Sequence, residues 1–510
     1  MLLRQGLLFG AALLLAGTAL AQPKPAQKAA APAPVQLTPP VQLTRPGAPS
    51  PNTGVPNAAA APGQLAVPHT LAQALALTYS TQPALQAERA KLRATDENVP
   101  QALSGWRPTV VLAGTLGYGD GVTRSYTPQL GTIVNTRTGR DIGTAQATVT
   151  QPLYTGGRTQ ANVNRARNQV MAERAQLLVQ EQTSFINTVN AYVTVIQNQQ
   201  LLALNVNNEQ VLAKQLQATN DRFRVGEITK TDVAQAEAAL AGATAQRQVA
   251  EGNLATARGT FQQIVGVLPP ADLVEPQPVQ LPLKTEQDAI ALARVNNPNV
   301  IAALYNNAAS KDAVDAAFAQ LMPQVSFQGQ TFQQQNAGTR TSSANGYQAV
   351  VQLSVPVYQG GTEYSQVRQA RQTEQQTNRL VDDARSTAVQ NAVNAWETLV
   401  AARASADSLR AQIRANEVAL EGVEREAIVG SRTTLDVLNA QQTLLSSRTN
   451  LVQALAQLVN ASFQMAQAVG RLTARDMHLP VPLYDETAYY NEVKNKWGGL
   501  GDYATNQPGR

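Results

Sequence analysis

The chain has 510 residues, no cysteine, two histidines and a formal net charge of +5 at neutral pH. The lack of cysteine excludes disulfides and thiol nucleophiles, and two distant histidines leave little for histidine-based metal or triad chemistry. The small net charge indicates no nucleic-acid surface. We therefore expect no enzyme activity, no cofactor and no metal site. Charged residues are only 15% of the chain, and the polar remainder is rich in Gln, Asn, Ser and Thr, which suits a channel wall or a coiled coil.

The N-terminal residues have the composition of a targeting sequence followed by a linker. Residues 1–21 combine Arg4, an apolar run and an Ala-Leu-Ala site, which predicts a cleaved signal peptide. The alternative, a membrane anchor, requires about 20 apolar residues, and this run is shorter. Residues 22–68 are rich in Pro and Ala, which predicts a disordered linker. It is either a plain spacer or a tether to the cell wall or a partner.

An internal repeat organises the rest of the chain. The sequence TLAQALAL at 70–77, followed by Pro83, recurs as TEQDAIAL at 285–292, followed by Pro298. QPLYTGG at 151–157 recurs as VPVYQGG at 355–361, and the residues missing from the second copy fall between two expected strands. We therefore expect one repeat at 69–284, a second at 285–474 and an unassigned tail at 475–510.

Each repeat begins with a helix that a proline interrupts, followed by two strands. Ala145, Ala147 and Val149 alternate with polar neighbours, and this period of two is typical of half-buried strands. A soluble sandwich and a membrane barrel both fit; strand lengths of about 10–12 residues and aromatic residues at the strand ends favour the barrel. Four strands cannot close around water, so a barrel requires oligomerisation, and three copies would supply twelve strands. The expected strands are 107–119, 143–155, 323–334 and 346–358, and the aromatic residues are Trp106, Tyr118, Tyr154, Phe332, Tyr347 and Tyr358.

Two long helical stretches end each repeat, joined at Gly226 in the first and Gly430 in the second. Apolar residues in the first helix of each pair step by four, three and four, which predicts a coiled-coil seam. Each copy should form a long helical hairpin. The expected helices are 157–223, 229–266, 361–428 and 433–470, and the expected seam residues are Phe185, Val189, Tyr192 and Ile196, then Val389, Val393, Trp396 and Val400.

The run VGSRTTLDVLNA at 429–440 closely resembles the second-repeat motif of the TolC-type outer-membrane efflux and secretion channels. The two Tyr-x-Gly-Gly junctions at 154–157 and 358–361 are also similar to those of this family. The resemblance implies a mainly α fold with a membrane β-barrel, formed by a homotrimer with twelve strands and a coiled-coil α-barrel in the periplasm. It also implies contact with outer-membrane lipid, a periplasmic adaptor and an inner-membrane pump, so that the chain is the passive exit duct of an efflux or type I secretion system.

In the family, the turns between the long helices form the periplasmic entrance. Carried over by position, Asp436 is an entrance carboxylate, Arg432 a latch residue, and Thr231 and Asp232 its partners. Asn439 stands where well-known members have a second Asp, and Ala427 where they have a Tyr; both changes weaken the expected gate.

Simpler explanations of these residues and of the chain remain open. Thr433-x-x-Asp436 and Thr229-x-x-Asp232 both fit a helix N-cap, which needs no gate. A periplasmic coiled-coil structural or adaptor protein without a pore is the alternative function, although adaptors carry one hairpin rather than two. A secreted enzyme would need a nucleotide, hydrolase or metalloprotease motif, and the sequence has none of these.

Overall fold

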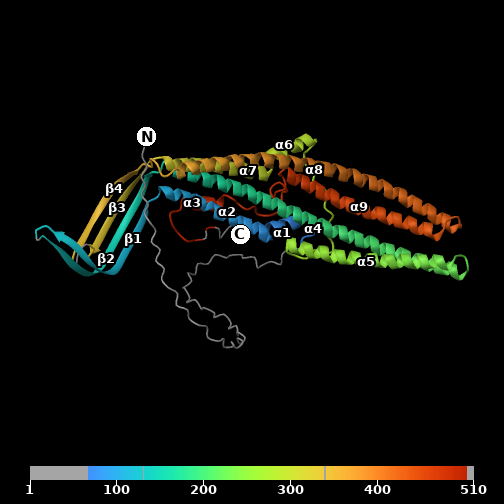
Figure 1. Ribbon diagram of the computed structural model, residues 1–510. Coiled ribbons are helices and arrows are strands. Elements are labelled where there is room, and N and C mark those ends of the chain that lie inside the picture. Colours follow the sequence, from blue (N-terminus) through green and yellow to red (C-terminus); the bar gives the residue numbers. More distant parts are fainter. Residues whose placement is uncertain (1–66, 130, 338–340, 502, 504–510) are drawn as a thin grey trace, which may run out of the picture. The chain divides into compact units, whose positions relative to one another are not determined.

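The computed structural model describes residues 67–129, 131–337, 341–501 and 503 (Figure 1). The expected signal peptide at 1–21, nearly all of the linker at 22–68 and the last residues of the tail lie outside this range.

Short helices open both repeats, and a proline divides them. The first repeat has α1 (Leu71–Thr81), α2 (Pro83–Asp96) and α3 (Asn98–Leu103), and the second has α6 (Glu286–Asn296) and α7 (Pro298–Phe318). A proline stands at the start of α2 and of α7, where its missing N–H would have no helical partner in any case. A single 3₁₀ turn, Ser104–Trp106 or Ala319–Leu321, leads from these helices into the strands.

The strands of both repeats form one antiparallel sheet in the order β1-β2-β3-β4 (Figure 1). The repeats meet where β2 pairs with β3, so β1 and β4 are the two edges. The strands are β1 (Thr109–Thr127), β2 (Thr132–Tyr154), β3 (Gln324–Gln335) and β4 (Ser343–Ser354).

The first two strands are longer than the sequence predicted. The expected strands at 107–119 and 143–155 leave a loop at 120–142, but the β1–β2 ladder continues from Gly117↔Ile142 to Thr127↔Thr132. These pairs extend past Gly143, where the pairing of β2 with β3 begins. Ladder hydrogen bonds tolerate glycine, and the ribbon is also crossed by an ion pair between Arg137 and Asp120 at 2.7 Å. The residues that the second repeat lacks therefore lie in a two-stranded ribbon.

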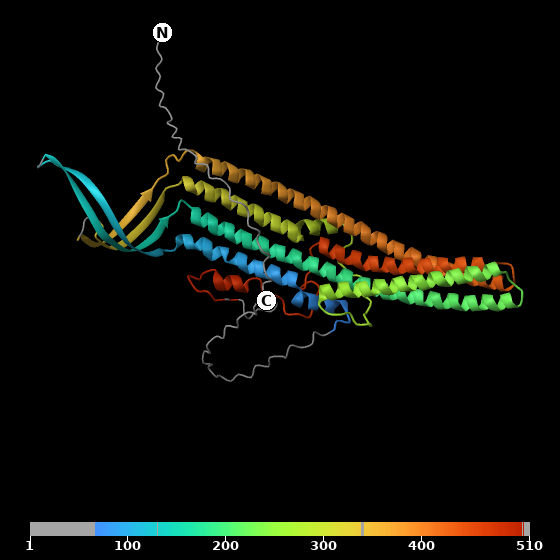
Figure 2. The same ribbon diagram turned by 60° about the horizontal axis from the view of Figure 1, so that its bottom comes forward.

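Each strand pair is followed by a helical hairpin. The outgoing helices α4 (Arg158–Arg224) and α8 (Thr362–Ile428) have 67 residues each, about 100 Å at 1.5 Å per residue. The returning helices are α5 (Lys230–Val265) and α9 (Thr434–Ala468). Both hairpin turns lie at the same end of this bundle (Figures 1 and 2). Among the helices of the described residues, we find no stretch with the length and hydropathy that crossing a membrane requires.

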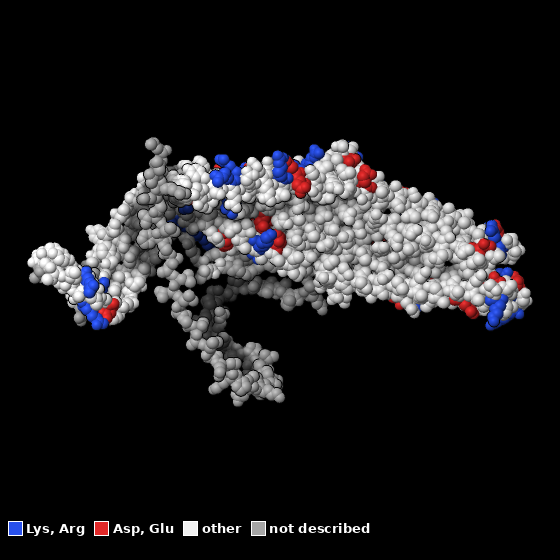
Figure 3. All heavy atoms as spheres, in the orientation of Figure 1, with Lys and Arg blue, Asp and Glu red and all other residues white. Residues whose placement is uncertain are grey.

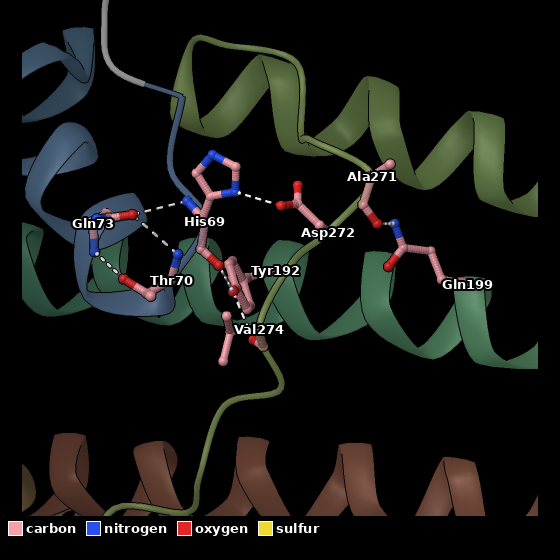
Figure 4. Close-up of polar contacts among 8 residues, drawn as sticks. All are labelled: His69, Thr70, Gln73, Tyr192, Gln199, Ala271, Asp272 and Val274. Carbon is pink, nitrogen blue, oxygen red and sulfur yellow. Dashed lines mark hydrogen bonds and ion pairs between the residues drawn. The ribbon is translucent and has the colours of Figure 1, made fainter.

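The predicted seam of the first hairpin is confirmed. Phe185, Val189 and Tyr192 are fully buried, and they belong to the main core together with residues of α1, α2, α5 and the C-terminal segment. Tyr192 also donates its hydroxyl to two carbonyl oxygens, those of His69 at 2.9 Å and Val274 at 2.8 Å (Figure 4). One side chain of α4 thus joins the start of the first repeat to the segment between the repeats.

The predicted seam of the second hairpin is borne out in part, because Val389, Val393 and Trp396 are half-buried. Val400 is 49% exposed, whereas the buried positions of α8 are mostly alanines such as Ala388, Ala392 and Ala395. Trp396 is partly buried beside α6. Small alanines let neighbouring helices approach closely. The face of α8 that is buried in the single chain is therefore the alanine-rich face and not the face with the largest apolar side chains.

Candidate functional site

The sheet has two faces of opposite character, because directly opposed residues of an antiparallel ladder share a face. Leu112 pairs with Ala147, which pairs with Thr331, which pairs with Tyr347. The same face carries Leu116, which is 94% exposed. The apolar members of this face are Val110, Leu112, Leu116, Ala145, Ala147, Val149, Val325, Phe327, Ala349, Val351 and Leu353.

The other face of the sheet is rich in amides and hydroxyls. Gln146 pairs with Phe332 on this face, and Thr148 pairs with Gln330, which in turn pairs with Gln348. Further polar members are Thr115, Thr144, Ser326, Gln328 and Gln352. A sheet that is apolar on one side and polar but uncharged on the other can separate lipid from an aqueous space. The alternation expected from the sequence is therefore present across all four strands.

The two hairpin turns have the same backbone design. Gly226 and Gly430 both adopt φ +79°, the left-handed conformation that glycine allows without strain. The N–H of Glu227 donates to Arg222 O, and the N–H of Ser431 to Glu426 O, each at 3.0 Å. Together with the bonds from Gly226 N–H to Phe223 O at 3.0 Å and from Gly430 N–H to Ala427 O at 3.3 Å, these contacts form a Schellman ending for α4 and for α8.

The returning helices begin with a reciprocal cap, as the N-cap interpretation predicted. Asp436 N–H donates to Thr433 Oγ1 at 3.3 Å, while the Thr433 N–H and hydroxyl donate to the Asp436 carboxylate at 3.0 and 2.9 Å. Thr229 and Asp232 make the same bonds at the start of α5. A third such pair, Thr285 and Asp288, caps α6 away from the turns.

These hydrogen bonds fix the charge state of the two carboxyls. Donation from the backbone and the hydroxyl of Thr433 holds the pKa of Asp436 below its usual value. The hydroxyl and backbone of Thr229 act in the same way on the pKa of Asp232. The positive end of each helix dipole also favours a negative group in the first turn. Both side chains are therefore ionised at neutral pH.

An ion pair crosses each turn, and the sequence analysis missed both. Arg432 donates to Glu426 at 2.9 Å, and this hydrogen bond raises the pKa of the arginine. At the first turn Arg222 pairs with Glu227. The acidic and basic residues on both sides of each turn glycine were the sequence signal from which these ion pairs could have been predicted. Charged atoms gather at this end of the molecule, as Figure 3 shows.

Among the described residues of one chain, no hydrogen bond or ion pair joins the predicted gate residues of one turn to those of the other. Asn439 and residues of α5 line one cavity of about 380 Å³ between the two hairpins. Arg432 and Thr231 are exposed, and Asp436 and Asp232 are half-buried. Within one chain Arg432 pairs with Glu426 rather than with Thr231 or Asp232, so the latch between them stays a prediction. In the described part of the chain, no group of three or more His, Asp and Glu side chains is placed to hold a metal ion.

Comparison with known proteins decides the family. The model of the outer membrane efflux protein family matches residues 75–267 and 289–471. The chain belongs to this family. It is 36% identical over 441 residues to the outer membrane efflux protein BepC of Brucella suis, covering 86% of this chain and 93% of that protein. It is 26% identical over 318 residues to TolC of Escherichia coli, covering 58% of this chain and 63% of TolC.

Solved structures show the same fold. CusC superposes with a TM-score of 0.69 at 14% identity, covering 78% of this chain and 92% of that one. VceC of Vibrio cholerae has a TM-score of 0.66 at 20% identity, covering 78% of this chain and 96% of that one. The predicted resemblance, fold class, outer-membrane location and role as an export duct are confirmed. Membership of a channel family also removes the alternative of a structural protein without a pore.

Proposed function

We propose that three copies of this chain close into one barrel and one helical tunnel, and that the duct receives its cargo from a periplasmic adaptor and an inner-membrane pump. The observation that carries the proposal is the open sheet of four strands, whose edges β1 and β4 each have a strand partner on one side only among the described residues. Three sheets of four strands joined edge to edge give twelve, which exceeds the roughly eight needed to close a barrel.

The two faces of the sheet set its orientation in this assembly. The face with Leu112, Leu116 and Val351 turns to lipid, and the face with Gln330 and Gln348 lines the lumen. β3 and β4 have 12 residues each, close to the 9–11 that a tilted strand needs to span a bilayer. Uncharged amides and hydroxyls bind passing polar groups weakly, so the wall conducts without selecting. Selection belongs to the pump, and the duct carries out no catalysis.

The entrance lies at the hairpin turns in this proposal. Three copies of Asp436 around one axis form a ring of negative charge that favours cations. Arg432, Thr231 and Asp232 act as the latch between hairpins once neighbouring copies are present. Asn439 contributes no charge, and Ala427 no aromatic contact, so closure depends on fewer groups than in members with Asp and Tyr at these positions.

The adaptor docks between the two hairpins. The cavity lined by Leu212, Leu435 and Leu438 combines apolar side chains with amides such as Gln246, and a second cavity of about 210 Å³ lies farther from the turns, lined by Leu204, Leu420 and Leu444 among others. Helices that carry an apolar ridge with polar flanks fit such a groove. A photo-crosslinking residue at Gln442 in the groove should therefore capture a periplasmic protein with paired helices, and one at the exposed Gln375 of α8 should not.

Cysteine cross-linking tests the trimer directly, because the chain has no cysteine of its own. Cysteines placed in series along β1 and β4 should join copies in membranes up to three chains and no further. Variants with cysteines in β1 alone should give no ladder. Extraction of the protein as a monomer without detergent would contradict the barrel.

A further inference from the structure

The C-terminal segment that follows α9 runs back along the first repeat. Leu472 and Ala474 are buried in the main core, and Lys496 O accepts a hydrogen bond at 2.5 Å from Arg107, two residues before β1. The guanidinium of Arg107 also lies 5.0 Å from the Trp497 ring. The segment therefore follows the first repeat from the end of α9 to the base of the sheet, and α10 (Ala488–Val493) packs on α2. Figure 2 shows it beside α2 and α3.

Polar contacts fasten this segment at several points. The N–H of Ala474 donates to Glu181 of α4 at 2.6 Å, and the N–H of Tyr484 donates to the hydroxyl of Tyr79 at 3.0 Å. The buried guanidinium of Arg89 lies 4.5 Å from the ring of Tyr79 and 5.1 Å from that of Tyr484. Further along, the Tyr489 hydroxyl donates to Glu97 at 2.7 Å, and Arg174 lies over the ring of Tyr490.

Two buried carboxyls lie beneath the segment. Glu181 of α4 is 7% exposed and lines a cavity of about 570 Å³ between α1, α2, α4 and the segment. Asp96, the last residue of α2, is 1% exposed, and its Oδ1 has no hydrogen-bond partner among the described residues. A buried carboxylate with an unsatisfied oxygen is costly, whereas the neutral acid is much less so.

We propose that residues 473–497 form a clasp that stays closed while Asp96 and Glu181 are protonated and opens when they ionise. The charged groups around both residues support this device. Asp476 and Glu486 of the segment and Arg89 of α2 face Glu181. Four charged residues face Asp96. They are Arg93 of α2, Glu97 at the C-cap of α2, Arg174 of α4 and the same Glu486. Glu486, which belongs to the clasp, thus repels both buried carboxylates. When these groups ionise, negative charges lie on both sides of the contact between the clasp and the first repeat.

The acid–base properties of the two groups agree with this arrangement. Burial raises the pKa of Asp96 to about 7, against the opposing effect of Arg174. Burial also raises the pKa of Glu181 to about 7, although the hydrogen bond from Ala474 and the charge of Arg89 act in the other direction. Both carboxyls therefore change charge near neutral pH.

The direction of the pH dependence of clasp opening follows from proton linkage. The closed clasp binds more protons than the open one between the ordinary carboxyl pKa and about 7, so the closed state loses stability as pH rises through this window. From pH 6 to pH 8 the opening constant should increase about tenfold for each carboxyl that opening exposes to water.

Hydrogen exchange of the full-length protein in nanodiscs tests the clasp, with rates corrected for the intrinsic effect of pH. In the wild type the protection factors of the Ala474 and Tyr484 amides should fall by about tenfold to a hundredfold from pH 6 to pH 8. In the double variant Asp96→Asn, Glu181→Gln they should stay at the pH 6 level. Glu417→Gln, on the distant surface of α8, is the matched control and should behave like the wild type.

A second variant covers failure of the double variant to fold. Glu486 is only half-buried. Glu486→Gln removes the shared repulsion and lowers the pKa of both buried carboxyls, so the protection factors should fall less between pH 6 and pH 8 than in the wild type. Equal protection at both pH values in the wild type would overturn the proposal. It would also be overturned if the fall persisted in the double variant, or if Glu486→Gln left the opening unchanged.

Discussion

The backbone N–H of Asp436 donates to the hydroxyl of Thr433 at 3.3 Å, and the same hydroxyl donates to the Asp436 carboxylate at 2.9 Å, in the first turn of α9. This contact caps the helix and, at the same time, keeps a negative charge beside the hairpin turn. Capping and a role at the entrance are therefore compatible. An experiment that separates the two roles needs a control variant in an equivalent cap away from the turns, such as that of Asp288.

The turn glycine should matter through its backbone alone. Gly430 has φ +79°, and a Cβ there would meet nothing within 4 Å. Gly430→Ala should therefore cost about 1–2 kcal/mol of local stability from the left-handed conformation. Gly422→Ala, in open space inside α8, should be neutral or stabilising because alanine favours helix. Hydrogen exchange at the turn distinguishes the two, and equal effects would contradict the assigned backbone strain.

Neighbouring residues of β3 should respond oppositely to a new charge. Gln330→Lys places a cation on the polar face and should lower cation conductance without loss of assembly. Thr331→Lys places it on the apolar face, where a lysine near the bilayer centre costs about 2–4 kcal/mol, and should reduce the folded trimer in membranes. Conductance and heat-modified gel mobility measure the two effects. A reversal of the two outcomes would mean that the faces are assigned the wrong way round.

The hydroxyl of Tyr192 should contribute measurably to stability. Tyr192→Phe leaves the carbonyls of His69 and Val274 without this buried donor, at a cost of about 1–3 kcal/mol. Tyr364→Phe, on the exposed surface of α8, is the control. We expect the urea midpoint to fall only for Tyr192→Phe, and an unchanged midpoint would show that water replaces the lost donor.

Cation preference should be insensitive to pH over the physiological range. The pKa of Asp436 is held below its ordinary value of 3.8, so the carboxylate remains charged from pH 8 down to pH 5. Its favourable contacts are present above that pKa and are lost only when the pH falls through the lower value of the folded protein. Reversal potentials in a salt gradient measure the preference. A loss of preference between pH 7 and pH 5 would identify a different group as its source.

Local patterns in the sequence predicted much of this architecture, because its elements rest on local rules. The prolines at 83 and 298, the turn glycines and the Thr-x-x-Asp caps each determine a helix end within a few residues. Two features required tertiary information. The β1–β2 ribbon is held by cross-strand pairing that glycine content obscured, and the buried face of α8 depends on which helices cover it. The burial of Asp96 and Glu181 could not be recognised from sequence, since it depends on the packing of α2, α4 and the C-terminal segment.

The candidate entrance was predicted only in part. The caps at Asp232 and Asp436 followed from residue spacing, whereas the pairs of Arg432 with Glu426 and of Arg222 with Glu227 depend on the geometry of the Schellman turns. Contacts between copies decide whether Arg432 changes partner from Glu426 to a latch residue, and a single chain contains no such contacts.

Single-channel recording in planar bilayers tests the central claim most directly, with wild type beside Asp436→Asn and Asp288→Asn. The two variants remove a carboxylate from equivalent caps, one at the turn and one on α6. We predict discrete cation-selective openings in the wild type and in Asp288→Asn, and a clear loss of cation preference in Asp436→Asn. Equal selectivity in all three proteins would contradict an entrance at this turn, and silence in all three, even after Arg432→Ala, would contradict the conducting duct.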